Sequence, residues 1–339
     1  MKILVTGATG FVGSYVARDC VSRGHEVTAL VRASSNTTSL KQLGAQLVFG
    51  DLGSSQQNSV SMPECDVVIH IAGLIKAKNT QDFYRVNTFG TRWLLDQLRY
   101  QEIKKFIYVS SISARGPNQN STSFDGKGAV SHYGKSKVQG EKIVLEYQNR
   151  FPVCIVRPPI VYGPGDPETL TLFRFFRRGF FPVIGKIPLK NSFIQVRDLS
   201  AMLIAMAEHQ GPTPSGRISA SGAPGAESSA SGPYYPDDGN SGYELDEMLG
   251  FAANVVGRKV RRIMVPIGLA RMVAWFSELG GDVFGNTPLL NSDKFKEMSQ
   301  PFWFCSANSL QETFRVSPTV SLNEGLKEAL AWYKQEGWL

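Results

Sequence analysis

The chain has 339 residues, of which 42% are hydrophobic and 19% charged, and its formal net charge is +7. This composition is typical of a folded globular protein and argues against wholesale disorder. A charge of this size, spread over this length, is only a weak preference for anionic ligands and does not indicate a nucleic-acid partner.

Short β-rich segments alternate with helical patterns through the first half of the chain. The predicted order is strand 2–6, helix 11–22, strands 26–31, 46–49 and 67–72, helix 86–99, strand 105–109, helix 132–149 and strand 153–156. Strict alternation indicates parallel pairing with right-handed crossovers, and continuous apolar strands indicate a sheet buried on both faces. We therefore expect an α/β fold with a doubly wound parallel sheet, and a ligand at the carboxyl ends of its strands.

The pattern is less regular in the second half. Phenylalanines and glycines dominate 173–181, and these aromatics would form either a pocket cap or the core of a small domain. Strand and helix return at 193–208, and a loop rich in Gly, Ser, Pro and Ala follows at 210–242. The remaining predicted elements are helix 243–249, a short strand within 255–265, helix 267–279 and helix 322–335.

Three glycines lie between the first predicted strand and the first predicted helix. Gly7 would allow a tight turn, Gly10 would let the backbone approach a pyrophosphate, and Gly13 would let the helix pack on the sheet. The unpaired N–H groups and positive dipole end of the helix suit phosphates. The expected dinucleotide contacts in this loop are Gly7, Thr9, Gly10, Phe11, Val12 and Gly13.

The second predicted strand is followed by Arg32, at the position where an acidic residue would bind the ribose 2′-hydroxyl of NAD. A guanidinium suits a 2′-phosphate by charge and by bidentate geometry, so the sequence favours NADP. The alternative is a solvated arginine that swings away, in which case NAD binds as readily. After the third strand, Asp51 and Leu52 are expected to contact the adenine ring.

Tyr133 and Lys137 are four residues apart, so on a helix they share one face. A free tyrosine has a pKa of about 10, and a nearby lysine together with an oxidised nicotinamide would lower that pKa towards neutrality. Tyr133 would then exchange a proton with a substrate hydroxyl or carbonyl while hydride moves. Ser110 and Ser111 end the preceding strand, and we expect Ser111 to orient the reacting oxygen.

In combination, these motifs resemble the extended short-chain dehydrogenase/reductase family, also called the NAD-dependent epimerase/dehydratase family. The matching segments are TGATGFVG, VNTFGT, VSSISARG, YGKSK, RPPIVYGPGD, FIQVRDL and VSLNEGLKEALAWYKQEGWL. The resemblance implies a Rossmann-type domain with a small, discontinuous C-terminal substrate domain. We expect 1–165 to form the NAD(P)-binding domain, with 193–210 rejoining it, and 166–192 and 211–339 to form the substrate-binding domain.

The resemblance also implies roles for individual residues. Tyr133 would be the acid/base, Lys137 its activator and Ser111 the hydroxyl that orients the substrate. Asn87, in VNTFGT, would be structural or part of a proton relay. Tyr133 and Lys137 are also expected to contact the cofactor, with Lys137 holding the nicotinamide ribose. The further cofactor contacts that the resemblance implies are Ala72, Gly73, Pro158 and Ile160, the last two at the nicotinamide end.

These residues favour an NADP-dependent oxidoreductase that transfers hydride between the nicotinamide and a ketone or secondary alcohol. Sugar dehydratases of the family carry an Asp-Glu pair where this chain has Ile112 and Ser113, so elimination of water is not expected. Two alternatives stay open: a nucleotide-sugar epimerase with tightly bound NAD, and a non-catalytic dinucleotide-binding or sensor protein. Arg174, Arg177 and Arg178 would clamp a substrate diphosphate or form the solvated face of a helix.

The remaining features concern partners and location. The four cysteines are far apart and the four histidines show no metal spacing, so we expect no metal site and a reducing compartment.

The apolar segment from Ile263 to Phe284 is broken by charges, which predicts a packed helix; a membrane-surface role is the alternative. We expect a cytoplasmic protein with a small-molecule substrate, no nucleic-acid partner and no stable membrane insertion. The predicted helices 86–99 and 132–149 are candidates for a homodimer contact.

Overall fold

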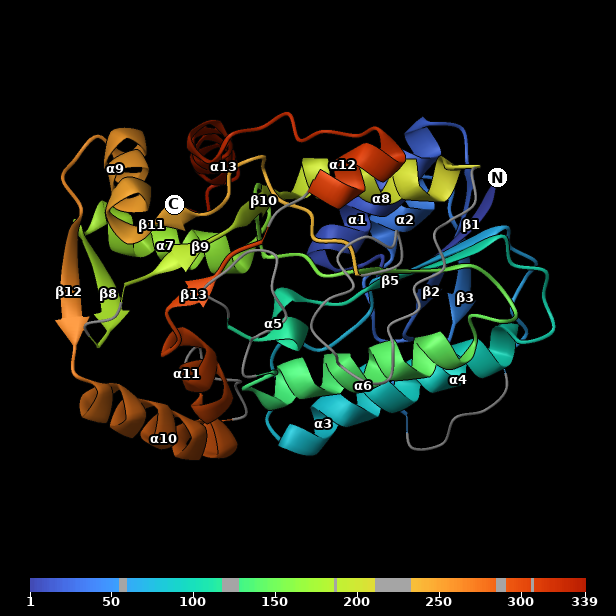
Figure 1. The fold of residues 1–339 in the computed structure, drawn as a ribbon, viewed down its shortest axis with the longest axis horizontal. Coiled ribbons are helices and arrows are strands. Elements are labelled where there is room, and N and C mark those ends of the chain that lie inside the picture. Colours follow the sequence, from blue (N-terminus) through green and yellow to red (C-terminus); the bar gives the residue numbers. More distant parts are fainter. Residues whose placement is uncertain (55–59, 118–127, 186–187, 211–232, 285–290, 306–307) are drawn as a thin grey trace.

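A six-stranded parallel sheet with the order β3-β2-β1-β4-β5-β6 lies at the centre of the molecule (Figure 1). The computed structural model describes residues 1–54, 60–117, 128–185, 188–210, 233–284, 291–305 and 308–339. The strands are β1 (Lys2–Thr6), β2 (Glu26–Val31), β3 (Gln46–Phe49), β4 (Val67–His70), β5 (Lys105–Val109) and β6 (Val153–Val156). The order reverses between β1 and β4, which confirms the predicted doubly wound α/β sheet and places a ligand-binding crevice at that reversal.

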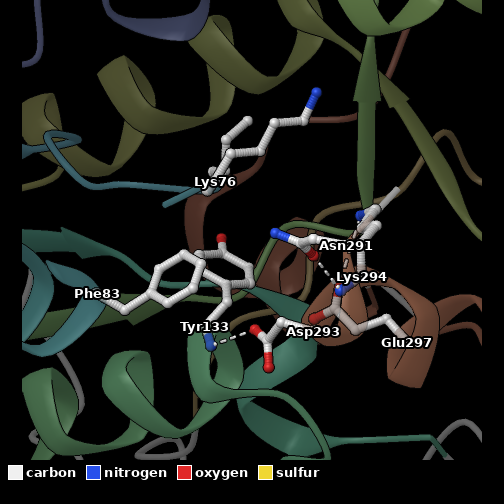
Figure 2. Close-up of a pocket in the computed structure, with 8 residues that line it drawn as sticks. Lys76, Phe83, Tyr133, Asn291, Asp293, Lys294 and Glu297 are labelled. Carbon is white, nitrogen blue, oxygen red and sulfur yellow. Dashed lines mark hydrogen bonds and ion pairs between the residues drawn. The ribbon is translucent and has the colours of Figure 1, made fainter. Parts of the chain in front are cut away.

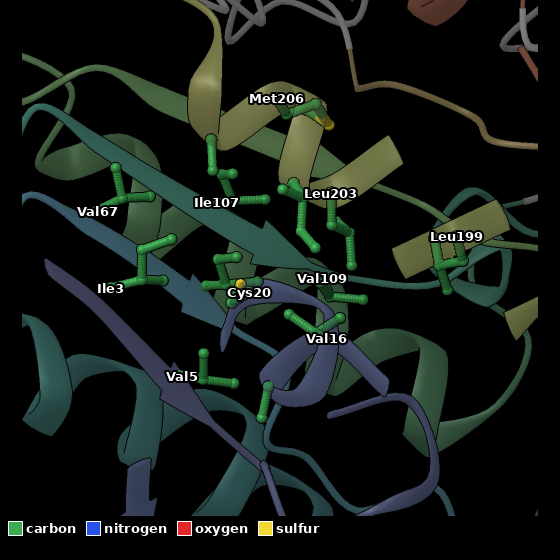
Figure 3. Packing of buried hydrophobic residues seen from close by; sticks show 14 of the residues in the cluster. Ile3, Val5, Val16, Cys20, Val67, Ile107, Val109, Leu199, Leu203 and Met206 are labelled. Atoms are coloured by element: carbon green, nitrogen blue, oxygen red, sulfur yellow. The ribbon is translucent and has the colours of Figure 1, made fainter. Parts of the chain in front are cut away.

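Helices cover both faces of this sheet because each strand sends alternate side chains to opposite sides. Ile3 and Val5 of β1 pack in one buried cluster, and Leu4 packs in another. The first cluster is completed by α1 (Phe11–Ser22) and α8 (Val196–Glu208), whose Val16 and Leu203 are seen among the strand side chains in Figure 3. The second cluster is completed by α4 (Gly90–Leu98) and α6 (His132–Glu146).

Several shorter elements complete the first half of the chain. They are α2 (Thr38–Gln42), α3 (Thr80–Tyr84), a π-helical segment η1 (Arg85–Phe89) and α5 (Ile112–Arg115). The sequence predicts one helix over 86–99, whereas the structure has η1 followed by α4. π-helical turns are rare and frequently occur at functional sites, and this one carries Asn87.

Most of the second half of the chain lies beside the carboxyl ends of the central strands, and its described residues form three small sheets and further helices (Figure 1). Its strands are β7 (Ile160–Tyr162), β8 (Phe180–Ile184), β9 (Lys190–Asn191), β10 (Phe193–Gln195), β11 (Tyr243–Glu244), β12 (Arg261–Val265) and β13 (Phe302–Trp303). Its other helices are α7 (Pro167–Arg177), α9 (Leu245–Val256), α10 (Ile267–Phe284), α11 (Ser292–Met298), α12 (Asn308–Phe314) and α13 (Leu322–Gln335). The sheets pair β10 with β7, β9 with β11 and β13, and β12 with β8.

Some predicted elements differ from the structure. The segment 173–181 has no predicted element, yet it contributes to α7 and β8, and Phe173 and Phe176 are core residues rather than a pocket cap. The predicted helix 243–249 begins as a strand, because Tyr243 pairs with Asn191 of β9 before α9 starts. Most of the predicted loop 210–242 lies outside the described residues. The predicted domain boundaries stay a prediction, although α8 packs in the same cluster as α1.

A buried carboxylate ties the segment before α13 to α8. Asp198, in the first turn of α8, accepts hydrogen bonds from the backbone N–H groups of Thr319 (3.0 Å) and Val320 (2.9 Å) and from Thr319 Oγ1 (2.7 Å). Hydrogen bonds to a buried charged acceptor are stronger than neutral ones, and the loss of such an acceptor leaves its donors unpaired. Asp198 therefore fixes how the C-terminal segment joins the sheet.

We expect Asp198→Ala to lower the free energy of unfolding by about 3 kcal/mol, because three donors lose their acceptor. The measurement is the urea midpoint of purified protein. Asp246→Ala is the matched control, since this carboxylate makes only an exposed ion pair with Arg262 and its loss should cost less than about 1 kcal/mol. Equal midpoints for the two variants would contradict the role assigned to Asp198.

Candidate active site

The turn between β1 and α1 leaves no room for side chains at two of its glycines. Gly7 has a φ of 73°, and a Cβ there would lie 2.8 Å from the backbone nitrogen of Ala72. A Cβ at Gly13 would collide with the carbonyl oxygen of Gly7. Gly10 is the N-cap of α1 and brings no capping side chain. The first N–H groups of α1 therefore keep their capacity to bind phosphate oxygens, and the turn fits a dinucleotide pyrophosphate.

The other predicted cofactor contacts at this side of the sheet follow β2 and β3. Arg32 comes directly after the last residue of β2 and is exposed. Asp51 is exposed two residues after β3, and its Oδ1 accepts a hydrogen bond from Gly53 N at 2.8 Å. Leu52 is buried, and its backbone packs against Gly90 of α4. Because β1, β2 and β3 are neighbours, these residues lie at the same sheet edge as the glycine turn.

Tyr133 and Lys137 lie in the first two turns of α6, beside the carboxyl end of β5. Ser131 caps this helix, and its side chain accepts a hydrogen bond from Gly134 N at 2.9 Å. Lys137 Nζ donates to the carbonyl oxygen of Val109, the last residue of β5, at 2.8 Å. Ser111, which caps α5, is near enough to Tyr133 to lower the pKa of its phenol. The structure thus brings the three predicted catalytic side chains to one place.

The structure distinguishes the two serines that end β5. Ser110 is buried, and its hydroxyl donates to Glu141 Oε1 at 2.5 Å. Glu141 is also paired with the guanidinium of Arg157, with Nη2 to Oε2 at 2.6 Å and both side chains almost fully buried. Ser110 is therefore part of a buried ion-pair network, whereas Ser111 is left beside Tyr133.

Burial shifts the pKa values of both Tyr133 and Lys137. Burial raises the pKa of Tyr133 to about 12, the Ser111 hydroxyl opposes this rise, and the Glu297 carboxylate adds to it. Burial lowers the pKa of Lys137 to about 8, and the carboxylate of Glu141 opposes that shift. In this structure the phenol is therefore protonated at neutral pH, and the lowering that the sequence predicts would need the positive charge of an oxidised nicotinamide.

Asn87 joins the end of β4 to α6. Its Oδ1 accepts from Leu74 N at 2.7 Å, and its Nδ2 donates to Leu74 O at 3.0 Å and to Ser136 Oγ at 2.9 Å. A Cβ at Gly73 would lie 2.9 Å from Asn87 Oδ1 and 3.2 Å from Lys137 Nζ. Ala72 and Gly73 therefore lie between the glycine turn and Lys137, and their contact with a cofactor stays a prediction.

The segment after β6 contacts the start of α5, next to Ser111. Pro158 is buried, and its carbonyl oxygen accepts a hydrogen bond from Ile112 N, next to Ser111, at 2.9 Å. Ile160 begins β7 and is 40% exposed. The carbonyl of Pro158 thus holds the backbone next to Ser111, and Ile160 follows two residues later. This position fits the place predicted for both residues at the nicotinamide end.

A small pocket opens above Tyr133 (Figure 2). It is lined by Ile75, Lys76, Phe83, Tyr133, Asn291, Asp293, Lys294 and Glu297. Asp293 Oδ1 accepts from His132 N at 2.6 Å, and its Oδ2 accepts from Tyr133 N at 3.0 Å. Glu297 Oε1 accepts from Ser131 Oγ at 2.8 Å. Two carboxylates of α11 therefore hold the positive end of the helix that carries Tyr133.

The sequence analysis misses these α11 residues altogether. Asp293 and Tyr133 are 160 positions apart, and no spacing or motif connects them. Asn291 caps α11, with its side chain accepting from Lys294 N, so the pattern Asn-Ser-Asp could have indicated a helix start here. Nothing in that pattern indicates that the helix lies against the active-site tyrosine.

Other predicted features are found away from this pocket. Arg174, Arg177 and Arg178 are exposed on and just after α7, whose phenylalanines pack inward, and none of the three lines the pocket as described. His70 is fully buried and both of its ring nitrogens have partners, with Nδ1 2.6 Å from Thr6 Oγ1 and Nε2 3.0 Å from Thr91 Oγ1. Within the described ranges, no group of three His, Cys, Asp or Glu side chains is placed to hold a metal.

Comparisons with known proteins identify a family and its relatives. Residues 3–219 match the model of the NAD dependent epimerase/dehydratase family. A ceramide reductase of Caulobacter vibrioides is 32% identical over 99% of this chain and 96% of its own length. A UDP-glucose 4-epimerase of Vibrio cholerae is 26% identical over 98% of this chain and 96% of its own.

Solved structures show the same fold. The UDP-glucuronic acid 4-epimerase of Bacillus cereus, in complex with UDP-glucuronic acid and NAD, superposes with a TM-score of 0.71 over 99% of this chain and 100% of its own. Its sequence is 20% identical. At that identity the likeness concerns the fold, and the relatives include both reductases and epimerases.

Lys137→Met should show how the buried ammonium affects folding. The pKa of Lys137 lies at about 8 in the folded chain and ordinarily at 10.5, so the unfolded chain binds more protons between these values. Wild-type stability therefore gains from a rise in pH through this window, whereas the variant has no such gain. We expect the unfolding temperature of the variant, relative to wild type, to fall as pH rises from about 7 to 10.

Lys135→Met is the matched control, because Lys135 is an exposed lysine of the same helix. Its difference from wild type should stay constant over that pH range in differential scanning fluorimetry. If the Lys137→Met difference were also constant, the ammonium would not be held in the buried position described.

Proposed function

Because the chain belongs to the NAD dependent epimerase/dehydratase family, and is an NAD(P)-dependent oxidoreductase or epimerase, we propose that it uses NADP to interconvert a ketone and a secondary alcohol. The observation that carries this proposal is Arg32, an exposed guanidinium directly after β2. An acidic side chain at this place would bind the 2′-hydroxyl of NAD, whereas a guanidinium suits the 2′-phosphate of NADP. Freely exchanging NADPH is the cofactor form that a reductase consumes.

The proposed mechanism assigns one task to each residue around the pocket. Bound NADPH would supply the hydride. Ser111 hydrogen-bonds and orients the substrate carbonyl oxygen, and Tyr133 gives that oxygen a proton. Lys137, held by the carbonyl of Val109, places a positive charge behind the phenol and stabilises the phenolate left after proton transfer. Because burial keeps Tyr133 protonated, the resting phenol is ready for the reductive direction.

The full-length likeness to a ceramide reductase supports reduction of a ketone. Because that relative is named for a lipid substrate, ketones on long-chain lipids are the first substrates to test. The dinucleotide contacts proposed above, from the glycine turn to Pro158 and Ile160, are those the family resemblance implies. A homodimer and a cytoplasmic location stay predictions.

A nucleotide-sugar epimerase is the second candidate, favoured by the full-length match to UDP-glucose 4-epimerase. That reaction needs a cofactor that stays bound and a site for a diphosphate. A basic clamp for a diphosphate would come from the exposed arginines on and just after α7, which are Arg174, Arg177 and Arg178. None of the three is among the residues that line the described pocket at Tyr133, so the pocket does not favour a diphosphate substrate. The non-catalytic interpretation is not proposed, since the relatives are enzymes.

Arg32→Ala should remove the preference for NADPH. Wild type is expected to bind NADPH at least about tenfold more tightly than NADH, a difference of about 1.4 kcal/mol, and the variant should lose this margin. Isothermal calorimetry with both cofactors measures it. Arg99→Ala, which removes an exposed arginine at the C-terminal end of α4, should keep the tenfold preference for NADPH. Tighter binding of NADH by wild type would favour the epimerase.

Tyr133→Phe should lower kcat by roughly 10²–10⁴-fold, the usual contribution of a general acid. NADPH affinity should stay within about twofold of wild type, because the phenyl ring keeps its packing against Phe83. The readout is NADPH oxidation in the presence of a ketone, with Tyr100→Phe as the exposed control. Full activity in Tyr133→Phe would exclude this residue as the proton donor.

A further inference from the structure

The described side chains in the first half of α10, from Ile267 to Trp275, are mostly apolar, yet few of them pack against the protein. Ala270 and Ala274 are buried in a cluster with Ile184 and Phe295. The large apolar side chains on its other sides are about half exposed: Ile267 (54%), Leu269 (46%), Met272 (49%), Val273 (47%) and Trp275 (54%). A helix that is hydrophobic all round is normally buried. The sequence predicts a packed helix, and among the described side chains of α10 the buried ones are Ala270 and Ala274.

The strand before α10 also exposes apolar side chains. β12 pairs with β8 alone, in a two-stranded ribbon. Ile263 and Met264 point to opposite faces of the ribbon, and they are 48% and 40% exposed. Figure 1 shows this ribbon and α10 at one end of the molecule, away from the central sheet. Apolar patches of this kind on a protein surface usually mark an interaction site.

Positive charges border the patch. From the end of α9 into β12 the chain reads Arg258-Lys259-Val260-Arg261-Arg262, where Arg261 and Arg262 are the first residues of β12, and all four of these basic residues are exposed. Arg271 adds an exposed guanidinium on α10 itself. The end of α7 is close by, since Arg258 Nη1 donates to the carbonyl oxygen of Arg177 at 2.8 Å. An acidic side chain near this border is Asp246, which pairs with Arg262 at 3.3 Å.

We propose that α10 and β12 dock on the surface of a bilayer that contains anionic lipids. Exposed Trp, Met and Leu side chains suit the boundary between headgroups and acyl chains, and the bordering arginines and lysine suit lipid phosphates. A second copy of this chain fits the patch less well, because a twofold contact would bring the two basic borders together. In the described part of the chain no helix is long and apolar enough to cross a membrane, so the contact is a surface contact.

The docked face adjoins the active site through α11. Phe295 of α11 lies in the same cluster as Ala270 and Ala274 of α10. The same short helix carries Asp293 and Glu297, which hold the start of α6 and line the pocket at Tyr133. A bilayer on α10 therefore lies one helix away from the pocket. The inferred membrane contact depends on the exposed side chains of α10 and β12 and is independent of the proposed reaction.

The test is flotation of the full chain with vesicles of phosphatidylcholine alone and of phosphatidylcholine mixed with phosphatidylglycerol. Wild type should float with the mixed vesicles, and high salt should weaken this binding. The double substitution Leu269→Gln with Trp275→Gln should lower the bound fraction by about tenfold or more. Arg258→Gln with Arg261→Gln should remove the preference for phosphatidylglycerol. Tyr100→Ser, which removes an aromatic side chain that is 83% exposed elsewhere, is the control and should bind as wild type does.

Circular dichroism and NADPH affinity check that each variant is folded, because the substituted side chains are exposed and lie outside the nucleotide edge. If folded wild type floats with neither vesicle, the proposal fails. It also fails if the double variant floats as well as wild type. A dimer in light scattering that the double variant converts to a monomer, without vesicle binding by wild type, would assign the patch to a second copy instead.

Discussion

The ammonium of Lys137 is buried against the carbonyl oxygen of Val109, at the point where β5 ends. A buried cation is costly unless its donors are satisfied, so the surrounding chain must be arranged for it. Gly73 leaves it space, since a Cβ there would come within 3.2 Å of Nζ. The ring of Tyr108 lies 4.9 Å from the ammonium, and Asn87 holds the neighbouring backbone. The positive charge of Lys137 therefore fixes how β4, β5 and α6 meet: the first two at their carboxyl ends and α6 at its start.

A second constraint comes from far along the chain. The carboxylates of Asp293 and Glu297 reach the N-terminal turn of α6, where Tyr133 stands. They satisfy helix N–H groups and the Ser131 hydroxyl, but Glu297 also raises the pKa of Tyr133. The second half of the chain thus positions the helix turn that carries Tyr133, and Glu297 adds to the rise in the pKa of Tyr133 that burial causes. The same α11 connects that position to the exposed α10.

Short sequence patterns predict the structure correctly where neighbouring residues decide it. The glycine turn, the helix register of Tyr133 and Lys137, and five strands of the central sheet follow from short patterns, and the structure has those strands at the predicted bounds. Such patterns fail where tertiary contacts decide. The π-helical turn at Asn87 depends on packing against α6, and β11 exists only because β9 is beside it. The pocket wall of α11 depends on a contact across 160 residues, which no spacing rule detects. The two serines after β5 look alike in sequence, and only the Glu141–Arg157 pair separates them.

The most direct test of the account is the stoichiometry of cofactor use. Purified protein is mixed with NADPH and, in separate reactions, with long-chain ketones and with UDP-glucose. Absorbance follows the cofactor, and mass spectrometry follows the substrate. We predict that one NADPH is oxidised for each ketone reduced to an alcohol, and that UDP-glucose is left unchanged. Conversion of UDP-glucose to its 4-epimer, without net change in the cofactor, would contradict the reductase and establish the epimerase in its place.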